Sequence, residues 1–442
     1  MRLRTSTLTY LLSAVFALMA ALTWLGAATA DTDTEPVKTE KTFAERFTME
    51  FRALTYGILQ EPSNSMQNPG NNFLQVPRYL GDLELRPDLR FDLDPLELMA
   101  KPRMRLEYSA WTGADIREHG SKWDDDWYVN EWLARVRVRE NLFASYGREN
   151  LQWGPSFLFS PSNPFFQDNG RRNPYVEVPG MDFGRVVWIP ASSWTLSSIA
   201  NTEEGRNKPN GPNPFKRTYA LKIEYTGREN NVSAILSHGE DSTNSFGFFG
   251  GWTISDAILL YGEGAITQGS EALYPKKDSS PLGARMIKLH ENSSKLEPVL
   301  LAGGSYTFGT NGTLTLEYSY YGPGYSDAEA DTYFSLRRKA AGAIRSGGLV
   351  SALGQMTLGQ TASTGLRFLR KNYAMVQYTQ TNIKNSIDLT LRWTQNLDDR
   401  SGQFTGLITY YLGKHLELFS VGTVMAGGKD AEFGSILDYQ WI

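Results

Sequence analysis

Arginine and carboxylate side chains recur at every second residue between Tyr79 and Trp111. A period of two is the period of a β-strand, so the charges share one face and apolar side chains take the other. The pattern resumes around residue 130. The charged members are Arg86, Arg90, Arg103, Arg105, Arg135, Arg137 and Arg139, with Asp82, Glu84, Asp88, Asp92, Glu107 and Glu131 facing the same way. Such a face can line a water-filled pore.

Two interpretations of this charged row stay open. It can polarise a lumen that filters or orients charged solutes. It can equally form cross-strand ion pairs that keep a wide polar barrel rigid. The near balance of the two signs favours ion pairing for many of the individual residues.

The segment 149–182 has the most specific sequence in the chain. It contains Gln152-Trp153-Gly154-Pro155 and Ser160-Pro161-Ser162-Asn163-Pro164 and is rich in aromatic residues. Exposed aromatic side chains are costly in solvent, so we predict that the segment folds into the lumen and narrows the pore. The alternative is a plug or cap. At a constriction we expect Arg148, Arg171, Arg172 and Arg185 to meet Glu177 and Asp182.

Residues for other kinds of chemistry are sparse. The chain has no cysteine, which excludes disulfides and thiol nucleophiles, and its four histidines lack the spacing of metal ligands. Ser237, His238 and Asp241 are close in sequence, but a hydrolase triad is placed by the fold and no nucleophile motif is present. We therefore predict no enzyme activity, no cofactor and no metal. A net charge of −4 without a basic aromatic patch argues against nucleic acid as a partner.

The elements that must position these residues are strands with alternating faces. They predict an all-β fold for residues 46–442, a transmembrane antiparallel up-and-down β-barrel of about 18 strands, with 16 as the alternative. The expected strands are about 46–59, two between 79 and 111, 129–139, 142–148, 183–189, 194–201, 216–226, 231–238, 245–252, 257–267, 298–308, 312–321, 366–380, 385–395, 403–412, 416–425 and 433–441.

Connection lengths support this count. Every long connection follows an odd-numbered strand, as expected for extracellular loops, and the others are short periplasmic turns. The long connections are 60–78, 112–128, 149–182, 202–215, 268–297 and 322–365. The last of these includes a basic run, 334–345, which suggests a short helix. That helix either attracts an anionic solute or lipopolysaccharide, or is simply a solvated face.

The two ends of the chain carry targeting signals. Residues 1–30 have a basic start, an apolar core and a small-residue cleavage site, which predicts a cleaved signal peptide rather than a membrane anchor. Residues 31–45 form a short periplasmic lead-in. The final strand resembles the aromatic signal that the outer-membrane barrel assembly machinery reads, although Trp441 and Ile442 replace the usual terminal phenylalanine.

Together these features resemble Gram-negative outer-membrane, porin-like barrels. The run from Gly147-Arg148 through Trp153-Gly154-Pro155 to Asn163-Pro164 is similar to loop motifs of alginate-export barrels, and its Trp-Gly-Pro part to Wzi-type capsule-assembly barrels. We expect a channel in the cell outer membrane for polar or charged solutes, in contact with lipid and lipopolysaccharide. The alternative that the resemblance implies is export or surface assembly of an anionic polysaccharide.

Overall fold

The computed structural model describes residues 43–111, 120–168, 170, 171, 173–207, 215–291, 294–429 and 431–442. The expected signal peptide and most of the lead-in lie outside these residues, and so does Arg172. One short helix, α2 (Phe43–Arg46), precedes the first strand. The cleavage site therefore stays a prediction.

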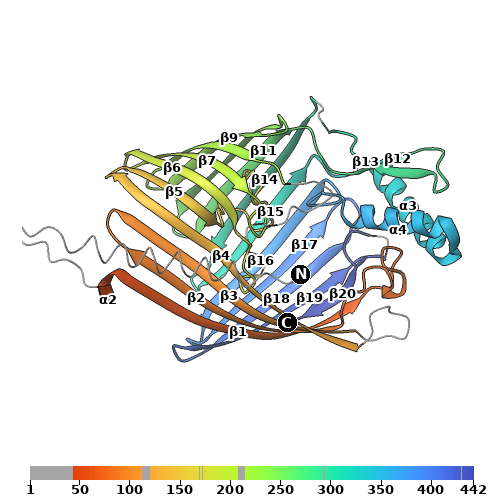
Figure 1. Cartoon of the computed structure of the whole chain (residues 1–442), viewed down its shortest axis with the longest axis horizontal. Coiled ribbons are helices and arrows are strands. Elements are labelled where there is room, and N and C mark those ends of the chain that lie inside the picture. Colours follow the sequence, from red (N-terminus) through yellow and green to blue (C-terminus); the bar gives the residue numbers. More distant parts are fainter. Residues whose placement is uncertain are drawn as a thin grey trace, which may run out of the picture. The chain divides into compact units, whose positions relative to one another are not determined.

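Eighteen antiparallel strands close into one barrel, because each strand pairs with the next and the last pairs with the first (Figure 1). They are β1 (Phe47–Pro62), β2 (Tyr79–Asp92), β3 (Leu96–Trp111), β4 (Gly120–Arg139), β5 (Leu142–Glu149), β6 (Met181–Ala191), β7 (Trp194–Glu203), β8 (Thr218–Thr226), β9 (Asn230–Gly239), β10 (Asn244–Ser255), β11 (Ile258–Gln268), β14 (Leu296–Thr307), β15 (Gly312–Tyr321), β16 (Asn372–Ile383), β17 (Ile387–Asn396), β18 (Gly402–Leu412), β19 (Leu416–Ala426) and β20 (Leu437–Trp441). Closure leaves no unpaired sheet edge, which a barrel in a bilayer requires. The predicted all-β barrel of 18 strands is confirmed.

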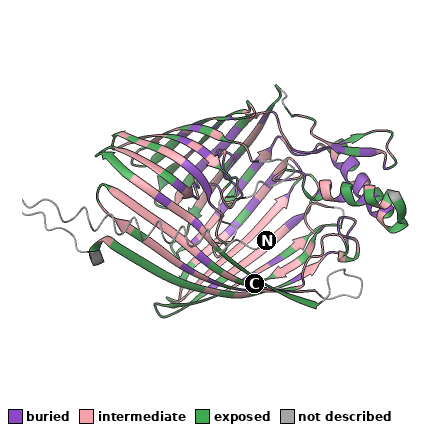
Figure 2. Ribbon diagram, in the orientation of Figure 1, coloured by how far each residue is buried: buried purple, intermediate pink, exposed green. Residues whose placement is uncertain are grey.

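The outer face of the barrel is apolar. Met49 on β1, Leu236 on β9 and Leu316 on β15 each expose more than half of their surface, at 54%, 57% and 52%. In a soluble protein such a surface would aggregate, whereas a bilayer covers it. Figure 2 shows exposed and less exposed residues alternating along the strands. Among the described helices, none has both the length and the apolarity needed to cross a bilayer.

Strand β4 begins earlier than the sequence predicts. The segment 112–128 is predicted as a loop, but β4 extends back to Gly120. A bulge lies opposite Lys101 and Pro102, where the pairing steps from Glu131 to Val129. The extra residue reverses the alternation, so Trp123 and Trp127 point outward at odd positions. A pattern search with a fixed period of two therefore stops at the bulge.

The end of the barrel with long connections carries added structure, and we call it the long-loop end; the other is the short-turn end. A two-stranded hairpin, β12 (Tyr274–Lys277) and β13 (Ala284–Ile287), and two helices, α3 (Asp327–Ser346) and α4 (Gly348–Ala362), lie there (Figure 1). A 3-10 turn, η1 (Pro69–Asn71), belongs to the same end. The predicted basic helix is thus a 20-residue helix, started by a capping box of Ser326 and Glu329.

Two predicted strands are shorter than expected. β16 begins at Asn372 instead of residue 366, and β20 begins at Leu437 instead of residue 433. Gly434 has φ of +94°, which ends the extended conformation before the last strand. The residues ahead of both strands turn inward and take part in the loop structure described below.

Candidate functional site

The connection between β5 and β6, residues 150–180, lies inside the barrel, and we call it the lumen loop. Its aromatic side chains pack on the inner wall: Phe166 is 2% exposed beside Phe183, and Phe159 is 1% exposed beside Tyr321. The first contact is with β6 and the second with β15. The aromatic side chains of the loop are therefore removed from solvent and packed against apolar residues on two sides of the lumen. This burial explains why the loop is so rich in aromatic residues.

Two carboxylates of the barrel wall hold the lumen loop. Glu317 on β15 accepts the backbone N–H groups of Phe157 at 2.7 Å and Leu158 at 3.0 Å. Glu263 on β11 accepts the hydroxyl of Ser162 at 2.7 Å and that of Ser160 at 2.5 Å. Both glutamates are nearly fully buried. Charge-assisted hydrogen bonds of this kind are stronger than neutral ones, so we call these two residues the wall clamp.

The Trp-Gly-Pro motif is explained by the wall clamp. Gly154 has φ of +86°, and a Cβ atom there would lie 2.3 Å from Glu263 Oε2. Only glycine fits this approach of the backbone to the carboxylate. Trp153 beside it stacks edge-on against Phe165 and lies under the Lys222 ammonium, 4.9 Å from the ring centre. The Trp-Gly-Pro motif thus attaches the lumen loop to the barrel wall.

Changing Gly154→Ala is expected to loosen the lumen loop, because the new methyl group overlaps Glu263. Limited proteolysis within 150–180 and the noise of the open-channel current are the measurements. The control is Gly413→Ala at a short turn, which also has positive φ, of +72°, but has open space around it. Equal effects of the two changes would show that backbone strain, and not the clamp contact, is responsible.

The far part of the lumen loop reaches the charged strands. Glu177 accepts two hydrogen bonds from Arg103, at 2.8 Å from Nε and 2.7 Å from Nη2, and the Arg103 side chain is fully buried. Arg86 donates to the carbonyl of Tyr175 at 2.9 Å. The Tyr175 ring stacks on Phe419 of β19, with ring centres 3.6 Å apart. The loop is therefore tied to β2, β3 and β19 as well as to the clamp strands, and it spans the lumen.

Most of the described charges that were expected to meet at the loop have other partners. Arg148 does pair with Asp182, at 2.7 Å. Arg185 pairs with Glu149, and Glu177 pairs with Arg103 of the charged row. Arg171 donates to backbone carbonyls of its own loop, including that of Ser156 at 3.0 Å. Sequence position alone does not reveal the partner of Glu177, because Arg103 lies on a strand 74 residues earlier in the chain.

Most of the remaining members of the charged row are paired along the wall. Arg105 binds Asp82 and Glu107. Near the short-turn end, one carboxylate, Glu97, holds two arginines. The pairs there and beside it are Arg90–Glu97, Arg135–Glu97, Arg137–Asp94 and Lys101–Glu131, while Arg139 is exposed at the β4–β5 turn. Ion pairing therefore describes most of this row, and among its predicted members Arg86 and Arg103 bind described residues of the lumen loop.

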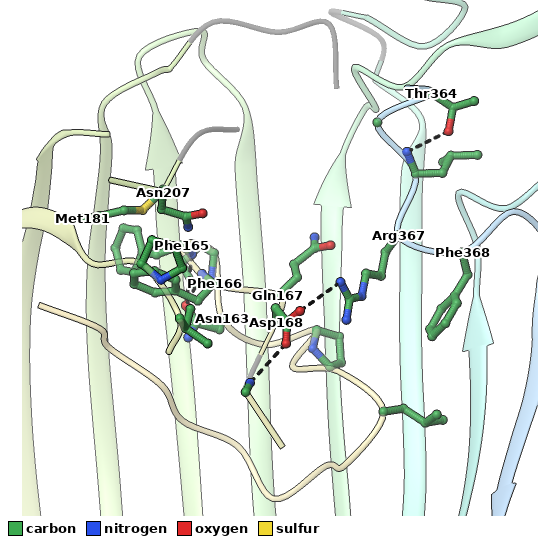
Figure 3. A pocket seen from close by; sticks show the side chains of 18 of the residues that line it. Asn163, Phe165, Phe166, Gln167, Asp168, Met181, Asn207, Thr364, Arg367 and Phe368 are labelled. Atoms are coloured by element: carbon green, nitrogen blue, oxygen red, sulfur yellow. Dashed lines mark hydrogen bonds and ion pairs between the residues drawn. The ribbon is translucent and has the colours of Figure 1, made fainter. Parts of the chain in front are cut away.

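A cavity of about 1090 Å³ lies between the lumen loop and the other connections of the long-loop end. Figure 3 shows Asp168 of the loop pointing to Arg367, which lies on the connection before β16, and the charged groups are 3.5 Å apart. Phe165 and Phe166 lie on the opposite side, next to Met181. We call this cavity the vestibule, because it lies on the long-loop side of the lumen loop.

The connections above the vestibule are joined through Glu432. Its carboxylate accepts hydrogen bonds from the Leu369 backbone N–H at 3.0 Å, the Asn396 amide at 2.7 Å and the Tyr373 hydroxyl. The residue keeps part of its surface exposed, but its carboxylate is turned inward. Burial raises the pKa of Glu432 to about 7 against the effect of these hydrogen bonds, and the nearby Asp399 carboxylate adds to the rise.

This contact is expected to weaken as the pH rises. An acid whose pKa is raised on folding adds stability below its usual pKa and loses it as the pH passes the folded value, here about 7. Hydrogen exchange in 364–372 and 427–436, corrected for its intrinsic pH dependence, should be faster at pH 8 than at pH 5.5. Glu432→Gln should remove the difference. If the variant shows a pH difference of equal size, a group other than Glu432 is responsible for the effect.

Ser237 and His238 are adjacent in sequence but lie on opposite faces of the barrel wall. Neighbouring residues of β9 face opposite sides, so Ser237 lines the vestibule and His238 lies on the outer face, with Nδ1 2.9 Å from Asn244 Oδ1. They do not form a catalytic pair. Within the part of the chain that the structure describes, no group of three or more potential metal ligands occurs.

Solved porins share this architecture. No protein-family model and no curated protein sequence matches the chain. OccAB1 of Acinetobacter baumannii aligns over 90% of this chain and 94% of its own, with a TM-score of 0.53 and 10% identity. OprD of Pseudomonas aeruginosa aligns over 91% and 95%, with 0.51 and 10%. A BenF-like porin of Pseudomonas fluorescens Pf-5 aligns over 90% and 96%, with 0.51 and 9%. The chain therefore has the fold of the Gram-negative outer-membrane porins.

Proposed function

We propose that the protein is an outer-membrane channel that passes small polar or charged solutes past a constriction formed by the lumen loop. The carrying observation is the loop itself, which spans the lumen and is fixed to opposite walls by Glu263, Glu317 and Arg103. A loop that only covered an entrance would not need buried carboxylates in the middle of β11 and β15. A fixed constriction sets which solutes pass by size and by the groups that line it.

The lumen wall carries both arginine and carboxylate side chains, which supports a channel that does not select strongly for either cations or anions. Each cation that touches the lumen loop from the charged row has an anionic partner, such as Glu84 for Arg86 and Glu177 for Arg103. Paired charges keep a polar wall rigid and wet while producing little net field. We expect weak ion selectivity in the native protein.

Export or surface assembly of an anionic polysaccharide is the second candidate, as the loop motifs of the sequence suggest. An anionic chain in transit needs an excess of cations along its path, whereas Arg86 and Arg103, the charged-row cations that contact the lumen loop, are paired with carboxylates. Export would also need the lumen loop to leave the lumen. The basic residues of α3, including Arg338 and Lys339, remain a proposed contact for lipopolysaccharide, and β20 a proposed signal for the assembly machinery.

Single-channel recording of the refolded protein in a planar bilayer tests the proposal. We expect discrete open steps and a reversal potential close to zero in a salt gradient. Absence of steps in the native protein, with large steps after deletion of 155–175, would show a closed barrel and favour the second candidate.

A further inference from the structure

The vestibule has one wall of neutral hydrogen-bonding groups. On β18 and β19, Thr405 and Thr423 face each other with their hydroxyl oxygens 3.3 Å apart, and Gln403 donates to Thr405 at 3.2 Å. All three line the vestibule, as do Thr394 and Gln440. Each hydroxyl or amide can both donate and accept, so this wall can exchange its internal hydrogen bonds for bonds to a solute.

Most charged side chains of the vestibule are already paired or hydrogen-bonded. Lys216 binds Asp241 at 2.7 Å and also binds Glu271, and Lys288 binds Glu291 at 3.2 Å. Among the other charged side chains of the described lining, Glu177 pairs with Arg103, and Arg392 donates to Gln377 and to the backbone carbonyl of Arg171. Nη1 of Arg367 lies 3.5 Å from Asp168, and its Nε and Nη2 are buried without a hydrogen-bond partner among the described residues. A charged solute would lose hydration here and would find its counter-charges already paired or, at Nε and Nη2 of Arg367, buried beneath the cavity surface.

Aromatic side chains complete the lining. Phe157, Phe215 and Phe433 contribute to the same cavity and keep part of their surface exposed. A neutral saccharide presents hydroxyl groups around its edge and C–H groups on its faces, and it has no charge. Hydroxyl and amide groups beside aromatic rings match both parts of such a molecule.

We propose that the vestibule admits and transiently binds neutral polyhydroxylated solutes, of the size of a monosaccharide or a short oligosaccharide, in preference to ions. This inference rests on the proposed channel function and names its solute class. The hydroxyl wall of β18 and β19 would bind the solute by hydrogen bonds that replace the solute's hydrogen bonds with water. The ion pairs of the opposite wall would remain intact as the solute passes.

Liposome swelling with the full-length refolded protein tests this with glucose, glucosamine and glucuronate, which share one ring and carry no charge, a positive charge and a negative charge. We expect glucose to enter several-fold faster than both charged solutes at neutral pH. Faster entry of either charged solute would overturn the inference and leave the channel function standing. Entry of none of the three would overturn the channel function and the inference with it.

The double change Thr405→Val with Thr423→Val should lower the rate of glucose entry. It should also reduce the ratio of that rate to the entry rates of the two charged solutes. The matched control is Thr307→Val with Thr313→Val, a similar hydroxyl pair, 3.1 Å apart, beside a turn at the short-turn end and outside the vestibule lining. Heat-modifiable migration on gels verifies that both variants fold. Equal glucose rates in the two double variants would contradict a role for the hydroxyl wall.

Discussion

Replacing both members of the wall clamp, Glu263→Gln with Glu317→Gln, is expected to raise the single-channel conductance several-fold and to add flicker between levels. Each glutamine keeps one acceptor oxygen, but its N–H₂ group faces donors whose hydrogen bonds the native carboxylate accepts. A hydrogen bond to a charged group contributes roughly 1.5–3 kcal/mol, and several are lost together. The lumen loop would then leave the wall for part of the time and widen the pore.

The control for this experiment is Glu97→Gln. This carboxylate also faces the lumen and binds two arginines, but it lies near the short-turn end, away from the lumen loop. We expect it to change ion selectivity slightly and to leave the conductance close to native. If the conductance of the double variant matches that of the control and of the native protein, the remaining contacts of the loop, such as the packing of Phe159 and Phe166 and the Arg103–Glu177 pair, hold it without the wall clamp.

The second large effect is expected from Arg103→Met. The Arg103 guanidinium is fully buried and neutralises Glu177 at 2.7 Å and Asp88 at 2.8 Å. Without it two carboxylates remain at the lumen loop with less compensation, which should make the channel clearly cation-selective. Removing one partner of a buried ion pair also costs roughly 3–5 kcal/mol, so the thermal midpoint of unfolding should fall.

Arg52→Met provides the comparison, because Arg52 binds the same Asp88 at 2.9 Å but its side chain is 62% exposed. An exposed pair contributes less than about 1 kcal/mol, so the thermal midpoint should barely change. Reversal potentials in a salt gradient compare the selectivity of the two variants. Equal reversal potentials would show that Arg103 does not set the field at the constriction.

The barrel was predictable because its determinants are local and repeat. Alternation along each strand and the parity of connection lengths give eighteen strands, and closure follows from pairing each strand with its neighbours. The prediction fails where one residue breaks the repeat, as at the bulge that extends β4 to Gly120. The hairpin β12–β13 is missed for another reason: four-residue strands in a polar loop carry too little pattern to be recognised.

The site was predictable as a segment but not as a set of contacts. Rings, glycine and proline indicated that 149–182 is an unusual loop. Glu263 and Glu317, which hold it, are single acidic residues on strands more than a hundred positions away from Gly154, and nothing local marks them. One signal was available: each breaks a run of small or apolar residues, Gly262 and Gly264 beside Glu263, and Leu316 and Tyr318 beside Glu317.

The central claim is that the lumen loop lies in the path of conduction. Because the chain contains no cysteine, a single Gln167→Cys change places one reactive thiol on the loop, at an exposed position that lines the vestibule. A charged methanethiosulfonate reagent should then reduce the current through open channels in discrete steps, while Ile408→Cys on the outer face should not respond. An unchanged current after complete labelling of Gln167→Cys would contradict the account.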